Sequence, residues 1–98
     1  MPGFELFGEK EKKEVLDVLE SGILMRYGFD NLRNGHFKAR DLESEINKRL
    51  NVSYSQLASS GTAAISMALA VAGIGAGDEV IIPSFTFVAS FEAVLLVG

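Results

Sequence analysis

The chain has 98 residues, of which 48% are hydrophobic and 22% are charged, and it carries a formal net charge of −4. This composition is typical of a small globular protein and excludes a disordered chain, and the acidic balance argues against nucleic acid as a partner. Because the sequence has no cysteine and one histidine, it excludes disulfides and thiol catalysis, and we expect no metal site and a cytoplasmic location.

The N-terminal segment lacks the basic start and the apolar run of a secretory signal peptide. A longer uncharged stretch, from Leu57 to Gly77, approaches the length of a membrane-spanning helix. Its serines and glycines dilute the apolar character, so a membrane hairpin is a remote alternative and no membrane partner is expected.

Two amphipathic helices are predicted in the first half of the chain. The spacing of apolar residues favours a helix over residues 8–22, with Gly22 as its left-handed C-terminal cap. No period is visible over residues 23–39, where glycines and asparagines indicate turns and predict an irregular loop. Asp41 is the expected N-cap of the next helix, which ends at Asn51.

Strands and helices alternate in the prediction for the second half. A short strand is expected over Tyr54–Ser59, and a β-branched run predicts a second strand over Val80–Ile82. Helices are expected over Thr62–Ala72, which is rich in alanine, and over Phe87–Val97. This order predicts an α/β fold that is predominantly helical with two short strands.

A small polar turn precedes the third predicted helix. Ser60, Gly61 and Thr62 follow the first strand, so free backbone N–H groups and the positive end of the helix dipole make this turn a candidate anion site. The same pattern also fits an ordinary N-cap without any ligand. Phe85 and Phe87 follow the second strand at the same sheet edge, where they either stack on a flat ligand or pack in the core.

A family resemblance covers nearly the whole chain. In the second half it rests on Ser-Gly-Thr, Gly-Asp-Glu-Val and Thr-Phe-Val-Ala in this order, within SSGTAAISMALAVAGIGAGDEVIIPSFTFVASFEAV. In the first half it rests on LDVLESGIL, RYGFDNLRNGHFKARDLE and INKRLNV. The sequence resembles the DegT-type sugar-nucleotide aminotransferases, which are pyridoxal-phosphate enzymes with the aspartate aminotransferase fold.

The resemblance implies roles for particular residues. It implies that Gly61 and Thr62 hold the phosphate of pyridoxal phosphate and that Phe87 stacks on the pyridine ring. It also implies a sugar nucleotide and an amino-acid donor as partners of the full-length enzyme. The loop before the second helix departs from many members in being longer and lacking tryptophan, so substrate contacts are not carried over. Weak candidates for the substrate pocket in this loop are Arg26, Tyr27 and His36.

The resemblance further implies that residues 1–98 are the N-terminal portion of such an enzyme. They then form a single incomplete domain, with a helix and an irregular loop over 1–39 and the start of the large cofactor-binding domain over 40–98. The family's chemistry needs a lysine that forms a Schiff base with the cofactor. None of the lysines in this chain matches that lysine, so we expect no catalytic residue here and no activity of the chain on its own.

One alternative and several questions stay open. In the resembled fold the two predicted strands are not neighbours, so their unpaired edges favour self-association into a homo-oligomer. The alternative is therefore a truncated gene product that persists as a non-catalytic, self-associating domain. The sequence leaves open whether a truncation is natural or experimental, which sugar and amino donor are used, and whether this chain alone binds the cofactor.

Overall fold

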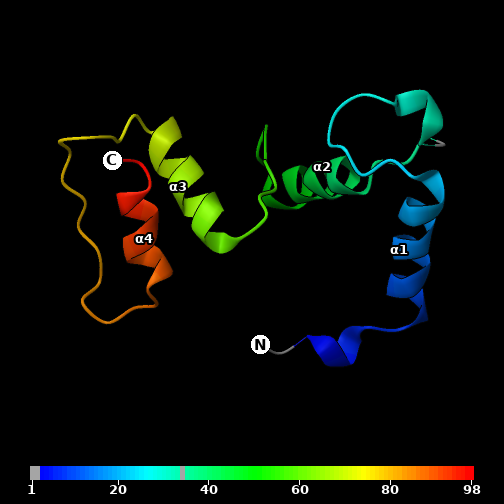
Figure 1. The fold of residues 1–98 in the computed structure, drawn as a ribbon, viewed down its shortest axis with the longest axis horizontal. Helices are drawn as coiled ribbons and strands as arrows, with labels where there is room; N and C mark the ends of the chain where they lie inside the picture. The colour runs from blue at the N-terminus through cyan, green and yellow to red at the C-terminus, as the bar shows by residue number, and fades with distance from the viewer. Residues whose placement is uncertain (1–2, 34) are drawn as a thin grey trace. The chain divides into compact units, whose positions relative to one another are not determined.

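The computed structural model describes residues 3–33 and 35–98, and in this part of the chain the regular structure is helical. The α-helices are α1 over Glu9–Ser21, α2 over Lys38–Leu50, α3 over Gly61–Val71 and α4 over Ala89–Leu95 (Figure 1). Short 3-10 helices precede α1 and α2, η1 over Phe4–Leu6 and η2 over Asp30–Leu32. The chain divides into two compact units, Met1–Ser55 and Gln56–Gly98. The predicted boundary after residue 39, where the large cofactor-binding domain is expected to begin, rests on the family resemblance and stays a prediction.

The two predicted strands are wrong. Within the residues that the structure describes, neither Tyr54–Ser59 nor Val80–Ile82 forms a strand, so the α/β prediction is replaced by a helical fold. The physical reason is that a strand is stable only when its N–H and C=O groups pair with a neighbouring strand. The two segments do not pair with each other, and both run as extended or bent chain without regular structure.

The unit Met1–Ser55 contains α1 and α2. The predicted end of the first helix is confirmed, because Gly22 has φ 68 and caps α1 in the left-handed conformation. The predicted N-cap of the second helix is wrong. The cap is Phe37, and the N–H of Asp41 already donates to the Phe37 carbonyl at 2.9 Å. Asp41 therefore lies in the first turn of α2, where its negative charge interacts favourably with the positive end of the helix dipole.

Lys38 connects α2 to α1 through two ion pairs. Its Nζ lies 2.5 Å from Glu14 Oε2 and 2.7 Å from Asp17 Oδ2, so one cation meets two carboxylates that are one turn apart on α1. The hydrogen bonds from Asp17 and Glu14 raise the pKa of Lys38 above its usual value. The same lysine lowers the pKa of Asp17. These groups are partly exposed, so the pairs orient the two helices more than they stabilise them.

The unit Gln56–Gly98 is built on the packing of α3 against α4. Ala93 of α4 is 0% exposed, and its carbonyl accepts a hydrogen bond from Ser66 Oγ of α3 at 3.2 Å. At the C-terminal ends of the two helices, Gly98 lies against Ala76. Because the C-terminal ends meet, α3 and α4 run in the same direction and their N-termini lie at one end of the pair (Figure 1).

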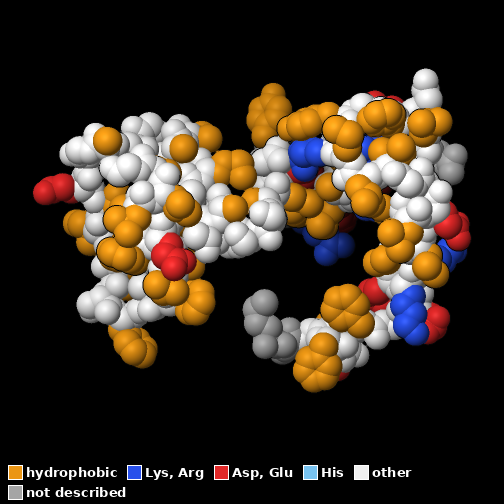
Figure 2. Space-filling model, in the orientation of Figure 1, with side chains coloured by type: hydrophobic (Ala, Val, Ile, Leu, Met, Phe, Trp, Pro, Cys, Tyr) orange, Lys and Arg blue, Asp and Glu red, His pale blue; other side chains and the backbone are white. Residues whose placement is uncertain are grey.

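Most large apolar side chains are exposed in the described residues. Ala93 is the buried hydrophobic residue there, whereas Leu19, Val71 and Leu96 are largely exposed. Figure 2 shows hydrophobic side chains over the visible surface of both units. None of the helices in the described part of the chain combines the length and the apolar character that a bilayer-spanning helix needs.

Candidate functional site

The first turn of α3 carries unused hydrogen-bond donors. Ser60 is the N-cap, and its Oγ accepts a hydrogen bond from the N–H of Ala63 at 3.1 Å. The Ser60 carbonyl accepts from the N–H of Ala64 at 3.0 Å, which begins the helical pattern. The N–H groups of Gly61 and Thr62 have no hydrogen-bond partner in the part of the chain that the structure describes. This turn therefore combines an ordinary serine cap with two free backbone donors.

The space in front of Gly61 is open. The residue is exposed, and no heavy atom outside its own neighbourhood in the chain lies within 4 Å of the position that a Cβ would occupy. The single proton of the Ser66 hydroxyl is shared between the carbonyls of Thr62, at 3.0 Å, and Ala93, at 3.2 Å, while the Thr62 hydroxyl has no partner among the described residues. The open space at Gly61 therefore lies beside two N–H groups and one hydroxyl that are free to donate to an anion.

Phe87 lies at the same end of the helix pair as Gly61 and Thr62. It lies two positions before Ala89, the first residue of α4, and the N-termini of α3 and α4 share one end of Gln56–Gly98 (Figure 1). Phe87 is 77% exposed and Phe85 is fully exposed, so neither ring packs in a core of this chain. The structure thus brings the two predicted phosphate residues and the predicted stacking residue to one end of one unit, where the Phe87 side chain is largely exposed.

No positive side chain contributes to this end of the unit. Gln56–Gly98 contains neither lysine nor arginine, and its charged residues are Asp78, Glu79 and Glu92. Asp78 is used locally, because its Oδ2 accepts the N–H of Gly75 at 2.9 Å in the turn after α3. An anion bound at the first turn of α3 would therefore be held by neutral donors and by the helix dipole alone.

The weaker candidates of the first unit lie in the loop before α2. The Nη2 of Arg26 lies 2.7 Å from Oε1 of Glu43, a residue that is 8% exposed. This hydrogen bond raises the pKa of the Arg26 guanidinium. Tyr27 is exposed, with the guanidinium of Arg26 5.9 Å from its ring centroid, and His36 is exposed as well. Arg26 is therefore occupied in an ion pair with α2, and the three residues do not converge on a shared polar centre.

One buried charge in this loop was missed by the sequence analysis. Arg33 is 8% exposed, and its Nε donates to the carbonyl of Gly28 at 3.2 Å. Its Nη2 also donates to the carbonyl of Met25. Arginine in a segment rich in glycine and asparagine normally indicates an exposed loop, so the local pattern offers no signal for this burial.

The sequence is similar to known proteins over almost its whole length. Residues 6–98 match the DegT/DnrJ/EryC1/StrS aminotransferase family. A UDP-N-acetyl-3-dehydro-alpha-D-glucosamine 3-aminotransferase of Acidithiobacillus ferrooxidans is 48% identical over 61 residues, which are 62% of this chain and 16% of that protein. A 3-amino-5-hydroxybenzoate synthase of Amycolatopsis mediterranei is 30% identical over 97 residues, 99% of this chain and 23% of that protein.

A GDP-perosamine synthase of Escherichia coli O157:H7 is 39% identical over 89 residues, which are 91% of this chain and 22% of that protein. The chain thus spans less than a quarter of the length of each of these three relatives. The family match runs through both units of the structure, because residues 6–98 include all four α-helices of the described part.

Proposed function

The chain belongs to the DegT/DnrJ/EryC1/StrS aminotransferase family, and on that premise we propose that it holds the phosphate and one ring face of pyridoxal phosphate. The observation that carries this proposal is the open first turn of α3, with its two free N–H groups, at the same end of the unit as Phe87. Two of the relatives are named for reactions of UDP- and GDP-linked sugars. We therefore propose a nucleotide-linked keto sugar and an amino-acid donor as substrates of the whole protein.

Each site residue has a distinct task in this proposal. The N–H groups of Gly61 and Thr62 and the Thr62 hydroxyl donate hydrogen bonds to phosphate oxygens, and the end of α3 adds its dipole. Ser60 fixes the first turn by accepting from Ala63, which keeps the two free N–H groups directed outward. Phe87 offers a flat apolar face against the pyridine ring. When bound, the cofactor supplies the electron-withdrawing ring through which amino groups are transferred.

We propose that the chain on its own is catalytically inactive. The covalent step of such enzymes needs a lysine whose amine is neutral and placed at the cofactor. All lysines of the chain, Lys10, Lys12, Lys13, Lys38 and Lys48, belong to Met1–Ser55 and none to the unit that carries Gly61. The most constrained of them, Lys38, is stabilised as an ammonium by two carboxylates, which is the opposite of what a nucleophile requires.

A trapping experiment tests activity. The purified chain is mixed with pyridoxal phosphate, reduced with borohydride and analysed by mass spectrometry and peptide mapping, alongside an assay for amino transfer. We expect no stoichiometric label on a single lysine and no turnover. One fully labelled lysine together with turnover would overturn the inactivity proposal, whereas the phosphate proposal is tested separately by titration with pyridoxal phosphate.

A second candidate function is a non-catalytic, self-associating domain. The observation in its favour is the exposure of large apolar side chains, with Ala93 as the buried hydrophobic residue among those described. Exposed apolar surface of this kind favours association. Sedimentation velocity over a range of concentrations tests it. Oligomers that persist on dilution support this candidate, and a monomer at all concentrations rejects it.

The cytoplasmic location that is expected from the sequence also stays a prediction.

A further inference from the structure

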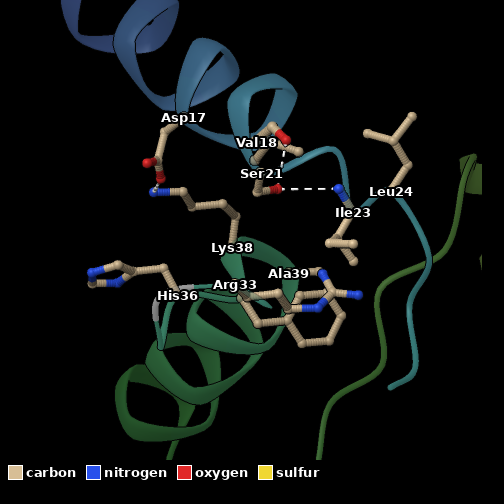
Figure 3. A pocket seen from close by; sticks show the side chains of 10 residues that line it. Asp17, Val18, Ser21, Ile23, Leu24, Arg33, His36, Lys38 and Ala39 are labelled. Carbon is tan, nitrogen blue, oxygen red and sulfur yellow. Dashed lines mark hydrogen bonds and ion pairs between the residues drawn. The ribbon is translucent and has the colours of Figure 1, made fainter. Parts of the chain in front are cut away.

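A pocket of about 220 Å³ lies within Met1–Ser55, apart from the residues that are proposed for pyridoxal phosphate. Its walls come from the last turns of α1, the segment that follows α1, and the start of α2 (Figure 3). Its charged lining residues are Asp17, Arg33 and Lys38, and His36 also lines it. The proposed function assigns no role to this pocket, so any inference about it stands independently of that function.

Arg33 is the distinctive group on the pocket wall. It is buried, with its guanidinium 4.3 Å from the centroid of the Phe37 ring, and it donates to the carbonyls of Met25 and Gly28. A guanidinium has five N–H donors, so these two hydrogen bonds leave others unused. No carboxylate forms an ion pair with Arg33 in residues 3–33 and 35–98. A buried cation without a carboxylate is costly, because buried charges are normally paired.

The other charged residues of the pocket compensate each other. Lys38 Nζ lies 2.7 Å from Asp17 Oδ2, and Figure 3 shows this pair on one side of the pocket. The remaining lining side chains are largely apolar and include Val18, Ile23 and Leu24. The lining of the pocket therefore consists largely of apolar side chains, the Lys38–Asp17 ion pair and Arg33. Among the described residues, no carboxylate balances the positive charge of Arg33.

We infer that this pocket binds a small organic monocarboxylate. The carboxylate accepts hydrogen bonds from the unused donors of the Arg33 guanidinium, and the apolar body of the ligand lies against Val18, Ile23 and Leu24. A single uncompensated cation matches a single negative charge. A phosphate dianion would bring twice that charge and no apolar body, so it fits this wall less well.

Benzoate is a suitable probe because it joins one carboxylate to a compact apolar ring. Benzamide is its matched control, since it has nearly the same shape without the charge. Titrations of the whole chain are followed by NMR through the ring signals of Phe37 and the methyl signals of Leu24. We expect benzoate to bind roughly 10-fold or more tightly than benzamide, as a charge-assisted hydrogen bond implies. Equal affinities, no shift with benzoate, or displacement of benzoate by equimolar inorganic phosphate would each overturn the inference.

Three variants locate the binding. Arg33→Gln removes the cation and is expected to reduce benzoate affinity at least 10-fold. Because Arg33 also holds two carbonyls of the loop, Ala39→Leu serves as an independent variant that fills the pocket and leaves those hydrogen bonds in place. The control is Arg40→Gln, since Arg40 lies 4.8 Å from the centroid of the Phe37 ring but does not line the pocket. Wild-type affinity in Ala39→Leu, or an equal loss in Arg40→Gln, would refute the assignment.

Discussion

Replacing Gly61 by alanine separates the two roles that the first turn of α3 can have, namely beginning a helix and holding an anion. Gly61 does not have a positive φ, and no heavy atom outside its own neighbourhood lies within 4 Å of the new methyl group. Alanine therefore enters without strain. Because it reduces the conformational freedom of the unfolded chain, Gly61→Ala should leave the free energy of unfolding unchanged or raise it by about 0.4–1 kcal/mol.

The expected effect on phosphate binding has the opposite sign. The methyl group occupies the open space through which a phosphate oxygen reaches the N–H groups of Gly61 and Thr62. Losing one hydrogen bond to a charged group costs about 1.5–3 kcal/mol, which corresponds to a roughly 10- to 100-fold weaker affinity. Helix stability and anion affinity should therefore move apart in a single variant, which a simple N-cap role does not predict.

The assay is a titration of the chain with pyridoxal phosphate, followed by the amide NMR signals of Gly61 and Thr62, with thermal unfolding measured by circular dichroism. The control is Gly75→Ala, because Gly75 lies at the opposite end of α3, where its new Cβ would meet the Val97 carbonyl at an ordinary 3.7 Å. The reasoning is refuted if the two amides of the wild-type chain do not respond to pyridoxal phosphate, or if Gly61→Ala binds it as tightly as Gly75→Ala does.

Three further substitutions test the N-cap of α3, the packing of α4 on α3, and the ion pair between α1 and α2. Ser60→Ala should destabilise α3 by about 0.5–2 kcal/mol and speed hydrogen exchange at the Ala63 amide, whereas Ser60→Asn should not; unchanged exchange in the alanine variant contradicts the cap. Ala93→Leu should cost about 1–3 kcal/mol in chemical denaturation because the site is fully buried, and a neutral result would mean that α4 does not pack on α3 there. Lys38→Met should lower the melting temperature at pH 7. Because the pKa of Asp17 is lowered in the folded state, this difference should shrink as the pH falls below about 4, and a difference that is independent of pH in this range argues against the ion pair.

The sequence predicted the helices well where the signals are local. Gly22 ends α1 in the left-handed conformation, as predicted, and Asn51 ends α2, also as predicted, in a left-handed conformation that was not part of the prediction. The start of α2 was placed at Asp41 because an acidic residue is a favoured cap, but Phe37 caps the helix without a side-chain hydrogen bond. The two strands failed for another reason, since a strand depends on partners that a single segment cannot specify.

The candidate site, like the helices, was predictable only where the signals are local. Their position at the start of a helix, which is a local property, marked Gly61 and Thr62 as either a candidate anion site or an ordinary cap, and the family resemblance implied the role with the cofactor phosphate. The structure places both residues in the first turn of α3, and their role stays a prediction. Phe87 was predicted to lie near them through a shared sheet edge, but the described residues form no sheet, and the parallel packing of α3 on α4 brings Phe87 to their end of the unit instead. The burial of Arg33 depends on its contacts with Met25 and Gly28, so no local sequence pattern predicted it.

The distribution of charge gives the two candidate anion sites different physical characters. All nine lysines and arginines lie in Met1–Ser55, so the charged side chains of Gln56–Gly98 are all acidic. At the first turn of α3 an anion would meet neutral donors and a helix dipole, which provide direction and geometry but no full positive charge. At Arg33 an anion would meet a buried full charge beside an apolar wall, where screening by salt is weak. The first arrangement suits a group that is positioned by several contacts at once, and the second suits a ligand that is held by one strong contact.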